Sequence, residues 1–252
     1  MSQWLAFSKK ELLETWRTKR VVLLFVIFTI FGIMNPLTAK LMPEIMKLSF
    51  GEGFPITEPT SLDSWLQFYK NISQIGVYLF AIIFSGTVSQ EIHKGTLINL
   101  VTKGLKRPVI LWSKWFILYL QWGLTLVVSF SITYGYTHFY FPDDKSPHPW
   151  LAFIPLLIFG FFFTSLIILT STVARSQFEG LLLTILVMII GYITGMFDQL
   201  KNWNPLSLMG ENITILQEAR RFSDLLPSMG VTVLLSFFFL IISIIILKQR
   251  KI

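Results

Sequence analysis

Hydrophobic positions in this chain fall in long uninterrupted runs. Six runs approach the roughly 20 apolar residues that a helix needs to cross a bilayer. Lipid offers no hydrogen-bond partners to the backbone, so such runs should be helical, and they are too long and too uniform for barrel strands. The pattern predicts an all-α membrane protein with transmembrane helices over residues 21–39, 71–88, 115–137, 151–173, 178–197 and 228–247.

The first twenty residues form a different pattern, in which polar and apolar positions share a helical period. At about 100° per residue, Leu5, Leu12 and Trp16 lie on one face of a helix, and charged side chains lie on another. Residues 1–20 are therefore predicted to form an amphipathic helix on the membrane surface. A charged tail that only anchors the topology is the alternative.

The polar connections on the side opposite the termini differ in character. Asn35-Pro36 is expected to kink or stop the first transmembrane helix, and residues 40–70 should hold one short helix. The segment 199–227 mixes apolar residues with several charges, which argues against a seventh span. We expect short re-entrant or interfacial helices there, before the sixth span.

Composition supports a membrane protein without a soluble domain. Of the 252 residues, 53% are hydrophobic and 14% are charged, whereas soluble domains carry about 25% charged residues. We therefore treat residues 1–252 as a single transmembrane domain. The chain has no cysteine, which excludes disulfides and thiolate metal sites.

Lys and Arg are distributed unequally between the two sides of the predicted bundle. The side that carries both termini holds 14 of the 21 basic residues and four acidic residues, a net charge of +10, and the other side has −3. Because positive loops stay inside, both termini are predicted to be cytoplasmic in a multi-pass protein of the cell membrane. The basic residues flank the spans and form no separate domain, so nucleic acid is not an expected partner.

Signals for catalysis are absent from the sequence. It contains no HExxH zinc motif, no GxSxG nucleophile elbow and no GxxxxGK[ST] phosphate loop. No catalytic, cofactor-binding or metal-ligating residue is predicted, and the chain is not expected to be an enzyme. If ATP drives it, a separate chain must bind and hydrolyse the nucleotide.

The fifth predicted span contains a GxxxG motif at Gly191 and Gly195. Small residues four positions apart allow two helices to approach closely. The motif is compatible with a dimer contact and equally with packing inside one chain.

The connection between the second and third spans, residues 89–107, is the longest on the terminal side. It is expected to form a helix over 89–102 that extends the second span, weakened at Gly95, with residues 103–107 returning the chain to the membrane. Leu97, Leu100 and Val101 would form an apolar patch for a soluble partner. An ordinary loop held by positive charge is the alternative.

The order of residues in this connection resembles that of ABC type-2 transporter permeases. The resemblance rests on Glu91, Gly95-Thr96, Leu100-Val101-Thr102, Arg107 and Lys114, and on a layout that extends over nearly the whole chain. Gly104 replaces a proline that is usual in the family, and Ser113 replaces a frequent glycine.

The resemblance implies a permease subunit of an ATP-driven exporter. It implies an ATP-binding cassette ATPase as partner, which would hold ATP and Mg, and a second permease copy or a related permease, with the first and fifth spans facing each other. It also implies a coupling helix that contacts the ATPase through Glu91, His93, Lys94, Gly95, Thr96, Leu97, Leu100 and Val101.

The sequence says less about the substrate. The 24 phenylalanines and the scarcity of charge in the spans suit an amphipathic peptide or a similar apolar molecule. The alternative function is a non-transport immunity or scaffold protein that sequesters a toxic peptide in the membrane.

Overall fold

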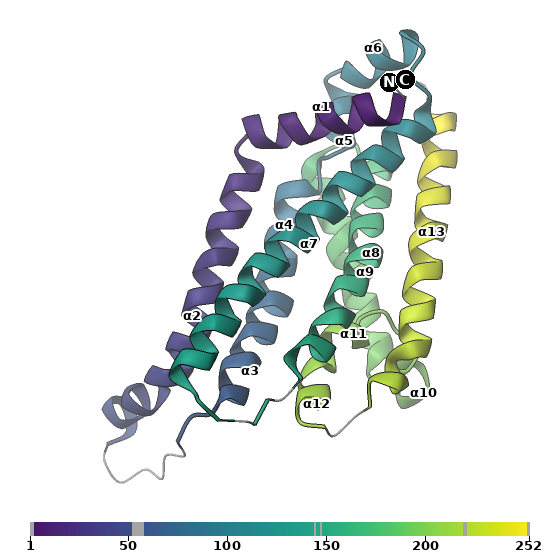
Figure 1. The fold of residues 1–252 in the computed structure, drawn as a ribbon. Helices are drawn as coiled ribbons and strands as arrows, with labels where there is room; N and C mark the ends of the chain where they lie inside the picture. Colours follow the sequence, from purple (N-terminus) through teal and green to yellow (C-terminus); the bar gives the residue numbers. More distant parts are fainter. Residues whose placement is uncertain (1–2, 52–57, 144, 147, 219–220, 251–252) are drawn as a thin grey trace.

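The chain is an α-helical, multi-pass membrane protein. A computed structural model describes residues 3–51, 58–143, 145–146, 148–218 and 221–250, and within these residues all regular elements are helical (Figure 1). Six helical stretches are long and apolar enough to cross a membrane, in agreement with the hydrophobic pattern. They are Arg20–Ser49, Ser61–His93, Arg107–Tyr140, Pro149–Val173, Gln177–Gly195 and Phe222–Gln249.

The first span, α2 (Arg20–Phe50), does not stop at Asn35-Pro36, where a kink or a stop was expected. It continues as one helix through Pro36 and Pro43. Proline has no N–H to bond the carbonyl four residues earlier. At Pro36 that carbonyl belongs to Gly32, and it accepts a hydrogen bond at 3.1 Å from the Thr133 hydroxyl on the third span. A neighbouring helix thus replaces the missing bond, as is common among packed transmembrane helices.

The second span begins about ten residues earlier than predicted. It consists of α3 (Ser61–Asn71), a π-helical turn η1 (Ile72–Gly76) and α4 (Val77–Phe84), followed by the short α5 (Ser89–His93). A capping box in which Thr60 and Asp63 bond each other begins α3. Next to the π turn, Asn71 donates to Asn35 Oδ1 at 2.6 Å. The short helix expected within 40–70 is therefore the first part of the span.

The remaining spans are α7 (Arg107–Tyr140), α8 (Pro149–Val173), α9 (Gln177–Gly195) and α13 (Leu226–Gln249). The most buried of them is α8, whereas most of α9 and α13 is exposed on the outside of the bundle. Trp122 of α7 lies against Gly160 of α8, where a Cβ atom would come within 2.2 Å of the indole ring. This close approach joins the two helices at the centre of the bundle.

At the end of the bundle away from the termini, the segment before α13 forms short helices, as expected. They are α10 (Asp198–Lys201), α11 (Ser207–Gly210), α12 (Asn212–Leu216) and the 3-10 turn η2 (Phe222–Leu225). Asn204 donates to the Gly191 carbonyl at 2.7 Å, and Asn212 donates to the Ala152 carbonyl. These bonds hold the segment against α9 and α8.

At the opposite end, which we call the terminal end because both termini lie there, α1 (Gln3–Arg17) crosses the ends of the spans (Figure 1). Leu12, Leu13 and Trp16 are exposed on it, while Phe7 and Glu11 are buried against the bundle. The helix is thus amphipathic and positioned as an interfacial helix, with α6 (Thr96–Thr102) beside it.

Candidate functional site

The connection between the second and third spans forms two short helices instead of the single helix predicted over 89–102. Gly95 separates α5 from α6 with a left-handed φ of 69°, a conformation that costs glycine little. The Thr96 hydroxyl donates to the Glu91 carbonyl at 3.1 Å across this break. The break turns α6 away from the axis of the second span, so we call residues 89–102 the bent segment.

A buried ion cluster joins the bent segment to α1 and α7. Lys114, near the start of α7, is only 1% exposed. Its ammonium group lies 2.8 Å from Glu11 of α1 and 2.9 Å from Glu91 of α5. Three elements that are far apart in sequence therefore supply charges to one buried contact.

A second ammonium group completes the cluster from its more exposed side. Lys10 Nζ lies 2.9 Å from Glu11, 2.6 Å from Glu14 and 2.9 Å from Glu91. Burial lowers the pKa of Lys10, but the charges of Glu11 and Glu91 outweigh it and raise that pKa above its usual value. With three carboxylates and two ammonium groups, the cluster has a net charge of −1.

The three carboxylates are also the group of side chains best suited to a metal ion among the described residues. One oxygen from each of Glu11, Glu14 and Glu91 lies within 4.8 Å of the others. Lys10 Nζ contacts all three carboxylates and so takes the position that a cation would need. The arrangement is that of an ion-paired structural cluster.

The predicted coupling residues divide into buried and exposed groups. Glu91 belongs to the ion cluster, and Leu97 is completely buried in the core of its own chain. Leu100 and Val101 are half-buried and pack against the same core. Leu97 therefore belongs to the core of its own chain, which corrects its assignment to a partner surface, whereas contact of a partner with Leu100 and Val101 stays a prediction. The side chains that remain exposed on the bent segment are His93, Lys94, Thr96, Ile98, Asn99 and Thr102, and Lys103 directly after it is also exposed.

Two arginines tie together the ends of three spans beside the bent segment. Arg107, at the start of α7, donates to the carbonyls of Leu247 and Lys248 at the end of α13, both at 2.7 Å. Arg250 donates to the Thr172 carbonyl at the end of α8 at 2.6 Å. These carbonyls have no partner within their own helices, and charged donors bond them strongly.

The GxxxG glycines of α9 are in close contact with their own chain. A Cβ atom at Gly191 would lie 2.8 Å from Leu206 Cδ1, and one at Gly195 would lie 2.9 Å from the Asn204 amide. The close approach therefore serves the segment before α13. This is the within-chain alternative, and a dimer contact at Gly191 and Gly195 stays a prediction.

Sequence reasoning selected Glu91 and Lys114 only through a resemblance, and it missed Lys10 and Glu11. The (i, i+4) spacing of Lys10 and Glu14 was visible as a pair on one helical face. Nothing local indicated that Glu11 would meet residues 80 and 103 positions further along the chain. The contact depends on α1 folding back across the bundle.

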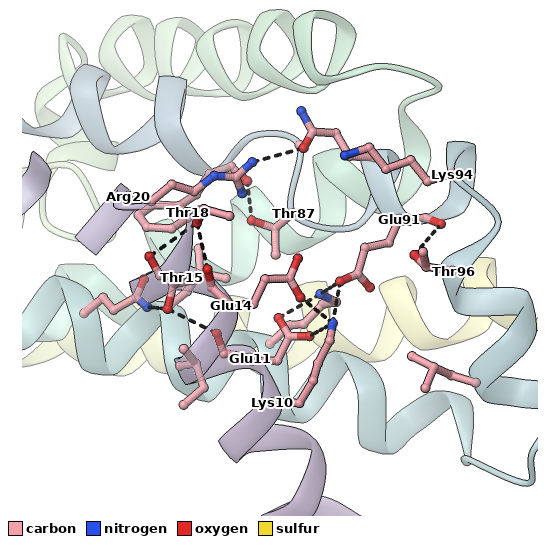
Figure 2. A pocket seen from close by; sticks show the side chains of 18 of the residues that line it. Lys10, Glu11, Glu14, Thr15, Thr18, Arg20, Thr87, Glu91, Lys94 and Thr96 are labelled. Carbon is pink, nitrogen blue, oxygen red and sulfur yellow. Dashed lines mark hydrogen bonds and ion pairs between the residues drawn. The ribbon is translucent and has the colours of Figure 1, made fainter. Parts of the chain in front are cut away.

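Beside the ion cluster lies a cleft of about 500 Å³. It lies between α1, the start of α2, α4, the bent segment and α7 (Figure 2). Its lining includes charged side chains and the apolar side chains of Phe84, Ile117 and Leu118.

Comparison with known proteins gives a general result. No family model matches the chain. The chain is 25% identical over 144 residues to the uncharacterized transmembrane protein YxlG of Bacillus subtilis (strain 168), an alignment that covers 56% of this chain. The chain spans about half the length of this curated relative, 54%. The similarity agrees with the helical bundle in placing the chain among transmembrane proteins.

Proposed function

We propose that this chain is the permease subunit of an ATP-driven exporter of the ABC type-2 class, working with a separate ATPase subunit. The ion cluster is the observation that supports the proposal most directly. Lys114 connects Glu91 of the bent segment to Glu11 of α1 and is itself part of a transmembrane helix. A partner that moves the bent segment would therefore also move α1 and α7.

The ion pairs of Lys114 with Glu11 and Glu91 are costly to separate, so they hold the bent segment, α1 and α7 together. Separating a buried ion pair leaves a charge without its partner, which costs about 3–5 kcal/mol. The bent segment can thus transmit a displacement without losing its contact with Lys114. Arg107 and Arg250 would pass the same displacement from α7 to α13 and α8.

The partner in this proposal is an ATP-binding cassette ATPase on the terminal end, which would be cytoplasmic. His93, Lys94 and Asn99 are exposed there and would form the contact surface, while ATP and Mg would be held by the ATPase. The transported molecule would be an amphipathic peptide or a similar apolar compound. Two permease copies would form the complete membrane unit.

Crosslinking tests the proposed contact because the chain has no native cysteine. His93→Cys or Asn99→Cys should crosslink to a co-expressed ATPase from a neighbouring reading frame, and Trp203→Cys, exposed at the other end, should not. Equal crosslinking at all three positions, or at none, would refute the coupling surface.

Mutation tests coupling itself. Gly95→Pro removes the left-handed turn and Glu91→Ala breaks the ion cluster, so each should reduce export and permease-stimulated ATP hydrolysis while the protein still inserts. Protection against a toxic peptide that persists without any ATPase would favour a sequestering immunity protein instead.

A further inference from the structure

The cleft beside the ion cluster lies at the level of the membrane interface. It opens next to α1, whose Leu12, Leu13 and Trp16 side chains are exposed. A helix that crosses the ends of the spans with an exposed apolar face lies among lipid headgroups. Phe84, Ile117 and Leu118 line the part of the cleft formed by the spans. The cleft is therefore accessible to phospholipid from the leaflet at the terminal end.

One part of the cleft carries positive charge that the protein does not neutralise. Arg20, Lys94 and Lys103 line it, and none has a carboxylate partner among the described residues. Arg20 donates instead to the side-chain oxygen of Gln90 at 3.1 Å. Guanidinium and ammonium groups bind phosphate oxygens well, so this part suits a phosphodiester.

The part of the cleft next to α1 and α7 has an excess of negative charge and of hydrogen-bond acceptors. The ion cluster there has a net charge of −1, and Glu91 Oε2 is buried with no hydrogen-bond partner among the described residues. Oε1 of Gln121, another residue that lines the cleft, is also buried with no hydrogen-bond partner among the described residues. Both atoms are acceptors, and a buried acceptor left unpaired costs free energy. A group that brings hydrogen-bond donors and one positive charge would satisfy both conditions.

We propose that the cleft binds the headgroup of phosphatidylethanolamine. The phosphate would lie on Arg20 and Lys94, and the primary ammonium would point toward Glu91 and Gln121. Phosphatidylcholine has a quaternary ammonium without N–H donors, and phosphatidylglycerol lacks a positive charge. This proposal rests on the cleft alone and does not depend on transport or on an ATPase.

Lipid retention measured by native mass spectrometry tests the proposal. The purified full chain, in detergent micelles that contain equal amounts of the three phospholipids, should retain phosphatidylethanolamine about tenfold better than the other two, because charge-assisted hydrogen bonds each contribute about 1.4 kcal/mol or more. Equal retention of the three lipids would overturn the proposal. Stronger retention of phosphatidylglycerol would also overturn it and would indicate a simple anion site.

Two variants test the phosphate contact and the ammonium contact of the headgroup separately. Lys94→Gln should weaken retention of phosphatidylethanolamine severalfold, whereas Lys9→Gln, an exposed lysine outside the cleft lining, should have no effect. Gln121→Leu should reduce the preference for phosphatidylethanolamine over phosphatidylcholine without abolishing lipid binding. Unchanged retention in Lys94→Gln, or an unchanged preference in Gln121→Leu, with melting temperatures like that of the wild type, would refute the assignment.

Discussion

The two ends of the bundle are held together by different chemistry. At the terminal end, five charged side chains from α1, α5 and α7 meet in one buried cluster. At the other end, the segment before α13 is held mainly by neutral groups, such as Asn204 on the Gly191 carbonyl and Asn212 on the Ala152 carbonyl. The segment also carries an ion pair between Lys201 and Glu211, in which the Lys201 side chain is 45% exposed.

The difference has a mechanical consequence. Each neutral hydrogen bond contributes about 1 kcal/mol, so the segment before α13 can lose one of these bonds and remain in place. The ion cluster is costlier to break, because displacing α5 removes Glu91 from both lysines and displacing α7 removes Lys114 from both carboxylates. At the terminal end, α1, α5 and α7 should therefore move together as one body. The segment before α13 should adjust locally.

The largest expected effect comes from Lys114→Met. This change leaves Glu11 and Glu91 without their buried partner and should lower the free energy of unfolding by about 3–5 kcal/mol. Denaturant unfolding in detergent micelles measures the loss. Lys10→Met is the matched control, and it should cost clearly less because its side chain is 40% exposed and Lys114 still pairs with both carboxylates. Equal losses in the two variants would contradict the assignment of Lys114 as the centre.

A smaller effect is expected from loss of the hydrogen bonds that Arg107 donates to the end of α13. Arg107→Gln removes the charged donor from the Leu247 and Lys248 carbonyls and should cost about 1.5–3 kcal/mol. Protease cleavage near the end of α13 should become faster, while cleavage in the segment before α13 should not change. Arg107→Lys should restore only part of the protection, because lysine lacks the planar fork of arginine. Full protection in Arg107→Gln would show that the hydrogen bonds of Arg107 contribute nothing.

At the other end, Gly191→Ala should have an effect of about 1 kcal/mol. The new methyl group would meet Leu206 at 2.8 Å, and the cost of overpacking is about 1–3 kcal/mol, partly offset by the better helix propensity of alanine. Gly123→Ala on α7 is the control, because no atom lies within 4 Å of its Cβ position, and it should be neutral or stabilising. If Leu206→Ala does not relieve the defect of Gly191→Ala, the close contact lies elsewhere, as in a dimer.

The smallest effect is expected at Asp143, in the loop between α7 and α8. Burial raises its pKa, but the hydrogen bonds from the Ser61 hydroxyl and backbone N–H, together with Lys145, outweigh this effect, so that the net pKa lies below its usual value. A carboxyl whose pKa is lowered in the folded state stabilises the protein above its unfolded pKa, and the contribution is lost as the pH falls through the folded pKa.

The comparison of wild type with Asp143→Asn measures this contribution. The difference in melting temperature should be small and constant near neutral pH, and it should shrink toward zero below about pH 4, where the carboxyl becomes protonated. A difference that grows on acidification would have the wrong sign for a lowered pKa.

Much of the architecture could be predicted from local pattern. Hydropathy located all six spans, and the helical period of residues 1–20 predicted α1 with its exposed Trp16. A kink or a stop was expected at Pro36, and the helix does not stop there. A proline rule describes one helix in isolation, whereas here Thr133 supplies the hydrogen bond that proline removes.

The candidate site was predictable only in part. The polarity of residues 89–107 singled out the right connection, and Gly95 was recognised as its weak point. Leu97 was predicted to face a soluble partner, although it is completely buried. The sequence could not distinguish the two cases, because an apolar residue in a polar loop can be buried either by a partner or by the core of its own chain.

By itself, the sequence determined that the chain is a six-span helical membrane protein with an amphipathic first helix and short helices before the sixth span, because length and hydropathy are local properties. The tertiary structure decided which charges meet. Glu11, Glu91 and Lys114 lie far apart in sequence, and their pairing exists only because α1 folds back over the spans and brings three elements to one buried point.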